Sequence, residues 1–228
     1  MRLTAEERRA LMELPIKRAR FGADEDVVRE GDHPGRSFVL LSGYAFSYKT
    51  TGESKRQMLA FHIPGDAPDL QSLHLKTMDN SVGTLTPCEI GFMEHAHIRA
   101  LCHRNPRLAD ALWREALIAS SVFREWVLNV GRREGASRVA HVLCEWFVRM
   151  RAVGLTEGYA CELPLTQSKL SDAVGFSAVH VNRVLQELRA RGLITLEAGR
   201  LDIHNWNGLV TLGDFDPSYL HQDSAEAA

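Results

Sequence analysis

The sequence has few cysteines and no long apolar run, and both absences narrow the class of protein. Its cysteines are Cys88, Cys102, Cys144 and Cys161. They include no Cys-x-x-Cys pair, so neither a zinc ribbon nor a dense disulfide framework is indicated. The first residues are polar and charged, and eighteen consecutive apolar residues occur nowhere in the sequence. We therefore expect a cytoplasmic protein with no signal peptide and no membrane contact.

An excess of positive charge is also missing, since the formal net charge is -2 at pH 7. Proteins that bind nucleic acid usually carry a basic surface, because the phosphates must be neutralised. Any contact with DNA must therefore come from locally clustered arginines. The 228 residues and the hydrophobic content of 45% are ordinary for a globular protein with one large domain or two smaller ones.

The stretch over residues 21–93 has the pattern of a small antiparallel barrel or roll. Residues 38–43 form a buried-strand run that ends in a glycine. Tyr44, Phe46 and Tyr48 then alternate with smaller or polar residues, as a strand with one buried face requires. Short apolar runs separated by glycines continue this pattern. We predict an α+β fold that begins with a jelly-roll-like antiparallel β-roll over residues 1–105.

A heptad pattern begins after Asn105-Pro106 and continues over residues 106–133. Apolar side chains recur there at alternating steps of three and four, which predicts a long helix. A single helix buried within one domain would show the same periodicity. Small alanines allow two helix backbones to approach closely, and large aromatic side chains supply buried area, so we favour a homodimer. The predicted dimer interface consists of Leu112, Ala116, Ala119, Phe123, Trp126 and Val130.

Residues 163–194 show the pattern of a helix-turn-helix followed by a hairpin. Thr166 is a good N-cap for the first helix, and Gly175 can adopt the left-handed conformation that ends it. Ser177 then caps a second helix. Because these signals occur in the required order, we predict a winged helix-turn-helix over residues 134–205.

The second helix carries a stripe of side chains that lies away from its apolar face. Val179, Arg183 and Gln186 recur there at steps of four and three, so they can enter a major groove together. An arginine can donate two hydrogen bonds to guanine, and Arg200 in the predicted wing can meet a phosphate. A helical hairpin or a dimer that contacts only other proteins is the alternative. We favour double-stranded DNA because cap, turn, helix and wing signals occur together.

The order of these motifs resembles the Crp/Fnr family of bacterial regulators, over nearly all of the chain up to about Asn205. The resemblance is carried in the roll by Glu30-Gly-Asp32, Phe38-Val-Leu-Leu-Ser-Gly43 and Pro64-Gly-Asp66, and in the DNA-reading unit by Leu165-Thr-Gln-Ser168 and Ser177 to Arg183. Such membership implies a symmetric dimer, a palindromic operator and contact with RNA polymerase.

The resemblance also implies roles for single residues. It places phosphates at Thr166, Ser168 and Ser177, and bases at Val179, His180 and Arg183. The chain departs from the family at the start of the second helix, where Ala178-Val179 replaces the usual Arg-Glu pair. This departure argues against the family's best-known operator sequence.

The same resemblance locates an effector pocket. Its expected residues are Asp69, Leu70, Asn80, Ser81, Phe123 and Arg124. In members that bind cyclic nucleotides, an Arg-Ser or Arg-Ala pair follows a Gly-Glu-Leu segment, and the arginine neutralises the cyclic phosphate. The matching stretches here, Pro68-Asp-Leu70 and Asn80-Ser81, lack that arginine. A buried phosphate would lose its charge-assisted partner, so we expect no tight binding of cyclic AMP and leave the effector open.

Histidines in or near the roll raise the hypothesis of a haem or metal site, and they are His62, His74, His95 and His97. A cupin-type metalloenzyme with His95 and His97 as ligands is an alternative of another class. It lacks the further acidic ligand and leaves the helix-turn-helix unexplained. An iron-sulfur cluster of the family type needs cysteines near the N-terminus, and the first here is Cys88. We predict no cofactor and no catalytic site.

The tail over residues 206–228 begins with apolar residues and ends with small and polar ones. We expect its first part to pack as a short helix and residues 223–228 to be disordered.

Overall fold

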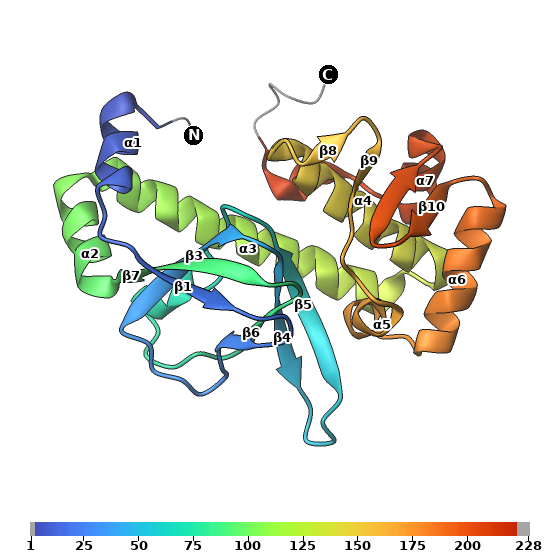
Figure 1. Ribbon diagram of the computed structural model, residues 1–228, viewed down its shortest axis with the longest axis horizontal. Coiled ribbons are helices and arrows are strands. Elements are labelled where there is room, and N and C mark those ends of the chain that lie inside the picture. Colours follow the sequence, from blue (N-terminus) through green and yellow to red (C-terminus); the bar gives the residue numbers. More distant parts are fainter. Residues whose placement is uncertain (1–2, 223–228) are drawn as a thin grey trace. The chain divides into compact units, whose positions relative to one another are not determined.

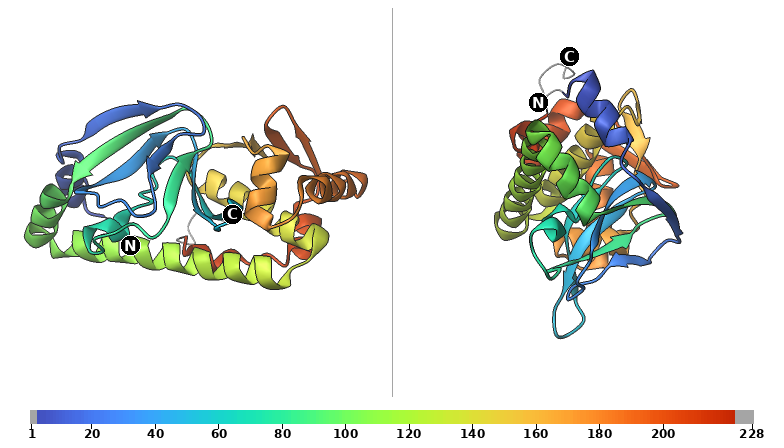
Figure 2. Two further views of the ribbon diagram at one scale, coloured as in Figure 1. Left: turned by 90° about the horizontal axis from the view of Figure 1, so that it is seen from below. Right: turned by 90° about the vertical axis from the view of Figure 1, so that its left-hand side faces the viewer.

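A computed structural model of the protein describes residues 3–222 (Figure 1). The expected disorder of residues 223–228 lies outside this range. The chain divides into two compact units, one of Met1–Lys49 with His62–Ser120 and one of Thr50–Phe61 with Ser121–Ala228. The long helix α3 (Pro106–Arg132) is shared between these units, and Figure 2 shows it as one uninterrupted helix. The predicted domain boundaries after residues 105, 133 and 205 stay a prediction.

The N-terminal part is a roll of two antiparallel sheets, with the strand orders β1-β7-β3 and β2-β6-β4-β5. The strands are β1 (Lys17–Phe21), β2 (Asp26–Val28), β3 (Arg36–Ser42), β4 (Ala45–Thr50), β5 (Arg56–His62), β6 (Ser81–Thr84) and β7 (Cys88–Glu94). β5 belongs to this roll by strand order, but its residues up to Phe61 fall in the second compact unit. The helices of this part are α1 (Ala5–Met12), the 3-10 helix η1 (Leu70–Leu73) and α2 (His95–Arg104). The structure thus confirms the predicted β-roll.

Alternating side chains of the strands form the core of the roll. Phe38 and Leu40 of β3 are buried against Val82 of β6 and Ile90 of β7. Gly43 joins β3 to β4 with a φ of +83°, and a Cβ there would lie 2.4 Å from the carbonyl oxygen of Pro87. Only glycine fits such a turn, which explains why the apolar run ends in this residue.

The second unit is built around α4 (Gly135–Ala152), most of which is buried. Its small antiparallel sheet has the order β10-β11-β9-β8. The other elements are β8 (Thr156–Glu157), β9 (Ala160–Glu162), α5 (Gln167–Val174), α6 (Ala178–Ala190), β10 (Ile194–Glu197), β11 (Arg200–Ile203), α7 (Trp206–Gly213) and the 3-10 helix η2 (Pro217–Leu220). The short helix expected after residue 206 is therefore confirmed as α7.

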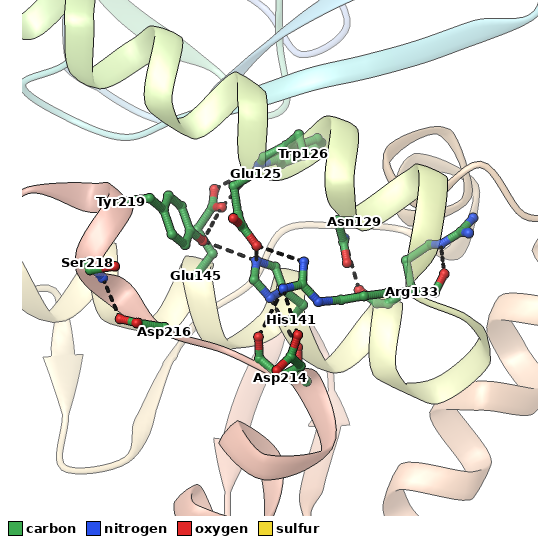
Figure 3. Close-up of polar contacts among 12 residues, drawn as sticks. Glu125, Trp126, Asn129, Arg133, His141, Glu145, Asp214, Asp216, Ser218 and Tyr219 are labelled. Carbon is green, nitrogen blue, oxygen red and sulfur yellow. Dashed lines mark hydrogen bonds and ion pairs between the residues drawn. The ribbon is translucent and has the colours of Figure 1, made fainter.

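A buried polar network ties η2 to α3 and α4 (Figure 3). The carboxylate of Glu145 accepts hydrogen bonds from the indole of Trp126 at 3.0 Å and the hydroxyl of Tyr219 at 2.7 Å. Beside it, Arg133 pairs with Glu125 at 2.8 Å and with Asp214 at 3.2 Å. The network holds the segment after the wing against the end of α3, because an unpaired buried carboxylate would be strongly unfavourable.

His141 lies in the same network, and its Nδ1 is 3.1 Å from the carbonyl oxygen of Gly213. Burial lowers the pKa of His141 to about 4, and the nearby guanidinium of Arg133 acts in the same direction. Because a carbonyl oxygen can only accept, the neutral ring donates its Nδ1 proton to Gly213. The folded protein therefore keeps this imidazole uncharged under neutral and mildly acidic conditions.

This low pKa predicts a loss of stability in acid. The unfolded chain binds a proton at His141 near its ordinary pKa of 6.5, whereas the folded chain binds it only near 4. The contribution is complete above pH 6.5 and lost as the pH falls towards 4, by about 2 kcal/mol at pH 5. Urea unfolding at pH 7 and pH 5 measures it. The His141→Gln variant should lose about 2 kcal/mol less than the wild type between these pH values, and equal losses would contradict the assignment.

Candidate DNA-binding surface

Helices α5 and α6 are bounded by the capping residues that the sequence predicts. The hydroxyl of Thr166 accepts a hydrogen bond from the backbone N–H of Lys169 at 3.1 Å. Gly175 ends α5 in the left-handed region with a φ of +70°. The hydroxyl of Ser177 accepts from the N–H of His180 at 3.2 Å. These caps fix a tight turn between the two helices and confirm the predicted helix-turn-helix.

The two faces of α6 meet different surroundings. One face is held in the core of the unit by Val181, Val184, Leu185 and Leu188, which are all buried. On the other side Val179 is 82% exposed, and Arg183 and Gln186 are also exposed. The division matches the predicted stripe, because residues three and four positions apart share one face of a helix. These three side chains are therefore free to meet a ligand.

Side chains from outside the motif hold the turn between α5 and α6. The guanidinium of Arg138 in α4 donates to the carbonyl oxygen of Val174 at 2.8 Å. Gln57, from the segment Thr50–Phe61 of the same unit, donates to the carbonyl oxygen of Ala173 at 3.0 Å. These donors satisfy the last carbonyl groups of α5, which have no partner within the helix. The sequence predicts neither residue, because no local pattern connects positions so far apart.

Arg183 and His180 are neighbours on the exposed side of α6. Nη2 of Arg183 lies 3.0 Å from Nδ1 of His180. The ring of His180 also contacts Phe176, with ring centroids 4.4 Å apart. The guanidinium of Arg138 lies over the ring of Phe176, 4.3 Å from its centroid. Arg183 is therefore exposed and yet oriented by a neighbour.

The predicted wing is the hairpin of β10 and β11, whose turn residues Ala198 and Gly199 both have positive φ. Arg200 pairs with Glu157 at 3.1 Å and with Asp202 at 3.2 Å. Hydrogen bonds to these carboxylates raise the pKa of Arg200. A phosphate at the wing would compete with both acidic groups for this guanidinium.

Three of the residues expected in an effector pocket, Asp69, Asn80 and Ser81, form hydrogen bonds within the roll. Asp69 accepts from the N–H of Phe38 at 2.9 Å, and burial raises its pKa to about 7. Asn80 donates to the carbonyl oxygen of Ser81 at 3.2 Å and accepts from Gln71 at 3.3 Å. A cavity of about 410 Å³ is lined by Asp69 and not by Leu70, Asn80 or Ser81.

The other two pocket residues, Phe123 and Arg124, lie on the half of α3 that belongs to the second unit and are exposed. These two residues therefore belong to a different unit from the other four, and the effector pocket stays a prediction.

The α3 residues predicted at a dimer interface do not all lie on one exposed face. Trp126 is only 4% exposed, because its indole packs against Phe61, with ring centroids 5.1 Å apart, and its Nε1 donates to Glu145. Its assignment to the interface is corrected, since the side chain belongs to the core of its own unit. The large apolar side chains that α3 does expose, between 45% and 64%, are Trp113, Leu117, Phe123, Val127 and Leu128. Leu112, Ala116 and Val130 are partly buried, and Ala119 is exposed.

His95 does not behave as a metal ligand in the roll. Its Nε2 lies 3.1 Å from the hydroxyl of Ser37 and 3.0 Å from that of Ser72, and all three side chains are buried. Over residues 3–222 no group of three or more histidine, cysteine or acidic side chains is placed to hold a metal ion. The ring therefore serves as a structural hydrogen-bonding group.

Comparison with known families gives two matches. Residues 137–212 match the Crp-like helix-turn-helix domain, and residues 18–105 match the cyclic nucleotide-binding domain.

Among the described residues, no helix has the length and apolar character that a bilayer crossing needs.

Individual relatives agree with these matches. The chain is 26% identical over 190 residues to the nitrogen fixation regulation protein FixK of Bradyrhizobium diazoefficiens, covering 82% of this chain and 78% of FixK. It is 25% identical over 205 residues to the transcriptional activator protein Anr of Pseudomonas aeruginosa, covering 88% and 82%. The solved structure of FixK2 from Bradyrhizobium japonicum aligns with a TM-score of 0.77 at 20% identity, over 87% of this chain and 98% of that one. This likeness confirms the predicted fold.

The turn between α5 and α6 should strongly favour glycine at position 175. Gly175→Ala introduces a Cβ in the left-handed region, which should lower the free energy of unfolding by about 1–2 kcal/mol. Urea unfolding measures the change. Gly52→Ala is the matched control, because no neighbouring atom lies within 4 Å and φ is ordinary there, so its effect should stay within about 0.5 kcal/mol. Equal stability of the two variants would contradict the strained turn.

Proposed function

The chain belongs to the Crp/Fnr family of transcription regulators, and we propose that it reads a palindromic operator as a symmetric homodimer. The family makes it a DNA-binding transcription regulator and not an enzyme. The observation that carries the proposal is the division of α6 into a buried apolar face and an exposed face with Val179 and Arg183. A helix held in this way can enter a major groove without disturbing its own core.

Two side chains of the exposed face suit base edges. The guanidinium of Arg183 can donate two parallel hydrogen bonds to O6 and N7 of guanine. The isopropyl group of Val179, which is 82% exposed, can pack against a thymine methyl group. Gln186 lies one turn further along the same face and is exposed as well. Together they would read a short half-site.

Phosphates would be held at the starts of α5 and α6. Thr166 and Ser168 at the start of α5 are exposed, and so is Ser177 at the start of α6. The backbone N–H groups of a first helical turn and its dipole both favour an anion. This local arrangement supports DNA binding despite the net charge of -2. Arg200 would contribute only after releasing Glu157 and Asp202.

A second copy of the chain is the proposed partner of the exposed stripe on α3. The stripe, defined by Trp113, Leu117, Phe123, Val127 and Leu128, exposes more large apolar surface on one helix than scattered surface residues do. It is rotated by about one residue, or about 100° around the helix, from the seam expected from the sequence. Pairing through it would place two recognition helices one DNA turn apart, about 34 Å.

The proposed regulator does not respond to cyclic AMP. The amide of Asn80, at the position where nucleotide-binding relatives carry arginine, donates to Ser81 and carries no charge to neutralise a phosphate. We also propose contact with RNA polymerase and a place in the cytoplasm, supported by the family resemblance and by the DNA target. The effector is left open.

Replacement of Arg183 tests the reading of DNA. Arg183→Ala should weaken binding to the selected operator by about 1–3 kcal/mol and relax the preference at one base pair of each half-site. The operator is obtained by selecting bound duplexes from a random pool. Arg191→Ala is the control, because Arg191 caps the C-terminal end of α6 and pairs with Glu187 at 2.5 Å, outside the reading stripe. Unchanged base preference in Arg183→Ala would overturn the proposed orientation of α6.

A charge in the stripe tests the dimer. Val127→Glu should raise the dissociation constant of the dimer by at least about tenfold, because pairing would bury a carboxylate without a partner. Analytical ultracentrifugation over a range of concentrations measures this constant. Val153→Glu is the control, since Val153 is 46% exposed, close to the 53% of Val127, and lies outside α3. An unaffected dimer would show that another surface joins the subunits.

A further inference from the structure

His180 occupies an unusual place on α6, between the turn and the main base-reading residue. Its Nδ1 lies 3.0 Å from Nη2 of Arg183. A guanidinium carries only donors, so Arg183 donates and Nδ1 accepts. The ring proton of the neutral imidazole must then be on Nε2.

The rest of the ring is enclosed. Nε2 is buried and finds no hydrogen-bond partner among the residues that the structure describes. Phe176 covers the ring, with centroids 4.4 Å apart and planes inclined by 50°. Phe176 is itself covered by the guanidinium of Arg138, which donates to the carbonyl oxygen of Val174. The stack of Arg138, Phe176 and His180 therefore joins α4 to the recognition helix.

This arrangement leaves His180 without a nitrogen for a base edge, because Nε2 is covered and Nδ1 already accepts from Arg183. The family resemblance assigns His180 to the bases. In the structure, the one acceptor of His180, Nδ1, instead faces Arg183, three positions further along the helix. An arginine side chain held in this way loses less freedom when it forms two parallel hydrogen bonds.

We propose that His180 is a positioning residue, which holds the guanidinium of Arg183 for base recognition and makes no base contact of its own. This inference rests on the proposed function, since it requires Arg183 to read DNA. Loss of a preorganised side chain of this kind typically changes affinity by about 2- to 12-fold. The effect should fall on discrimination between base pairs and spare binding to random DNA.

The experiment uses the full-length protein and the operator selected by it. The base pair read by Arg183 is the one whose preference disappears in Arg183→Ala. Discrimination is the ratio of affinities for the operator and for the same duplex with that base pair exchanged, measured by fluorescence anisotropy. Binding to a random duplex and the melting temperature are measured in parallel for every variant.

Two replacements of His180 separate the acceptor from the ring. His180→Phe keeps an aromatic ring but has no acceptor, and should lower discrimination by about 2- to 12-fold with little change on random duplex. His180→Asn places an amide oxygen close to the position of Nδ1 and should restore most of the discrimination. His204→Phe, in the exposed segment after the wing, is the matched control and should leave discrimination unchanged. Failure of His180→Asn to restore discrimination, at an unchanged melting temperature, would overturn the proposal.

A double replacement decides whether His180 acts through Arg183. In the Arg183→Ala background, His180→Phe should cause no further loss of discrimination at any base pair. A further loss there would mean that His180 reads a base itself, and would overturn the positioning role. If Arg183→Ala changes discrimination and His180→Phe alone does not, only this inference fails. If Arg183→Ala has no effect, the proposed function fails with it.

Discussion

The DNA-binding surface depends on the burial of one face of α6 against the rest of the second unit. Four apolar side chains, from Val181 to Leu188, are removed from water there, and each contributes on the order of 1.5–3 kcal/mol. This anchoring fixes the rotation of the helix about its axis. The exposed face is thereby fixed too, because residues on opposite sides of a helix cannot both turn inward. Caps, turn and neighbouring side chains adjust the helix ends, but the apolar face determines which residues point outward.

The helix-turn-helix was predictable because its caps and turn depend on neighbouring residues. The exposed face of α3 was not predictable, because it depends on tertiary packing. Thr166, Gly175 and Ser177 act within their own turns, so residue type alone indicates their conformations. Trp126 shows the opposite case. Heptad spacing places it with Phe123 on a seam, yet it packs against Phe61 and donates to Glu145 within its own unit. A period of three and four recurs on adjacent stripes of one helix, and only the packing decides which stripe stays exposed.

The same limit applies to polar side chains. Resemblance to the family placed Asn80 and Ser81 in an effector pocket, and in the structure they bond to each other and to the backbone. Gln57 and Arg138 support the turn before α6 from distant positions, without any motif that marks them. His180 was grouped with the base-reading residues, although its acceptor faces Arg183. The sequence indicated which polar side chains could form functional contacts, but only the structure shows the hydrogen-bond partner of each.

The network around Glu145 has a consequence for the order of events during protein synthesis. Trp126 and Glu145 leave the ribosome early, but the hydroxyl that completes the carboxylate's hydrogen bonds belongs to Tyr219 in η2. Until η2 has emerged, Glu145 must stay hydrated or incompletely paired, and burial of the carboxylate is opposed. A nascent chain in which α5 and α6 have already emerged therefore still lacks the hydrogen bond from Tyr219 that completes the core of the second unit. Completion of the DNA-reading unit therefore waits for the emergence of η2.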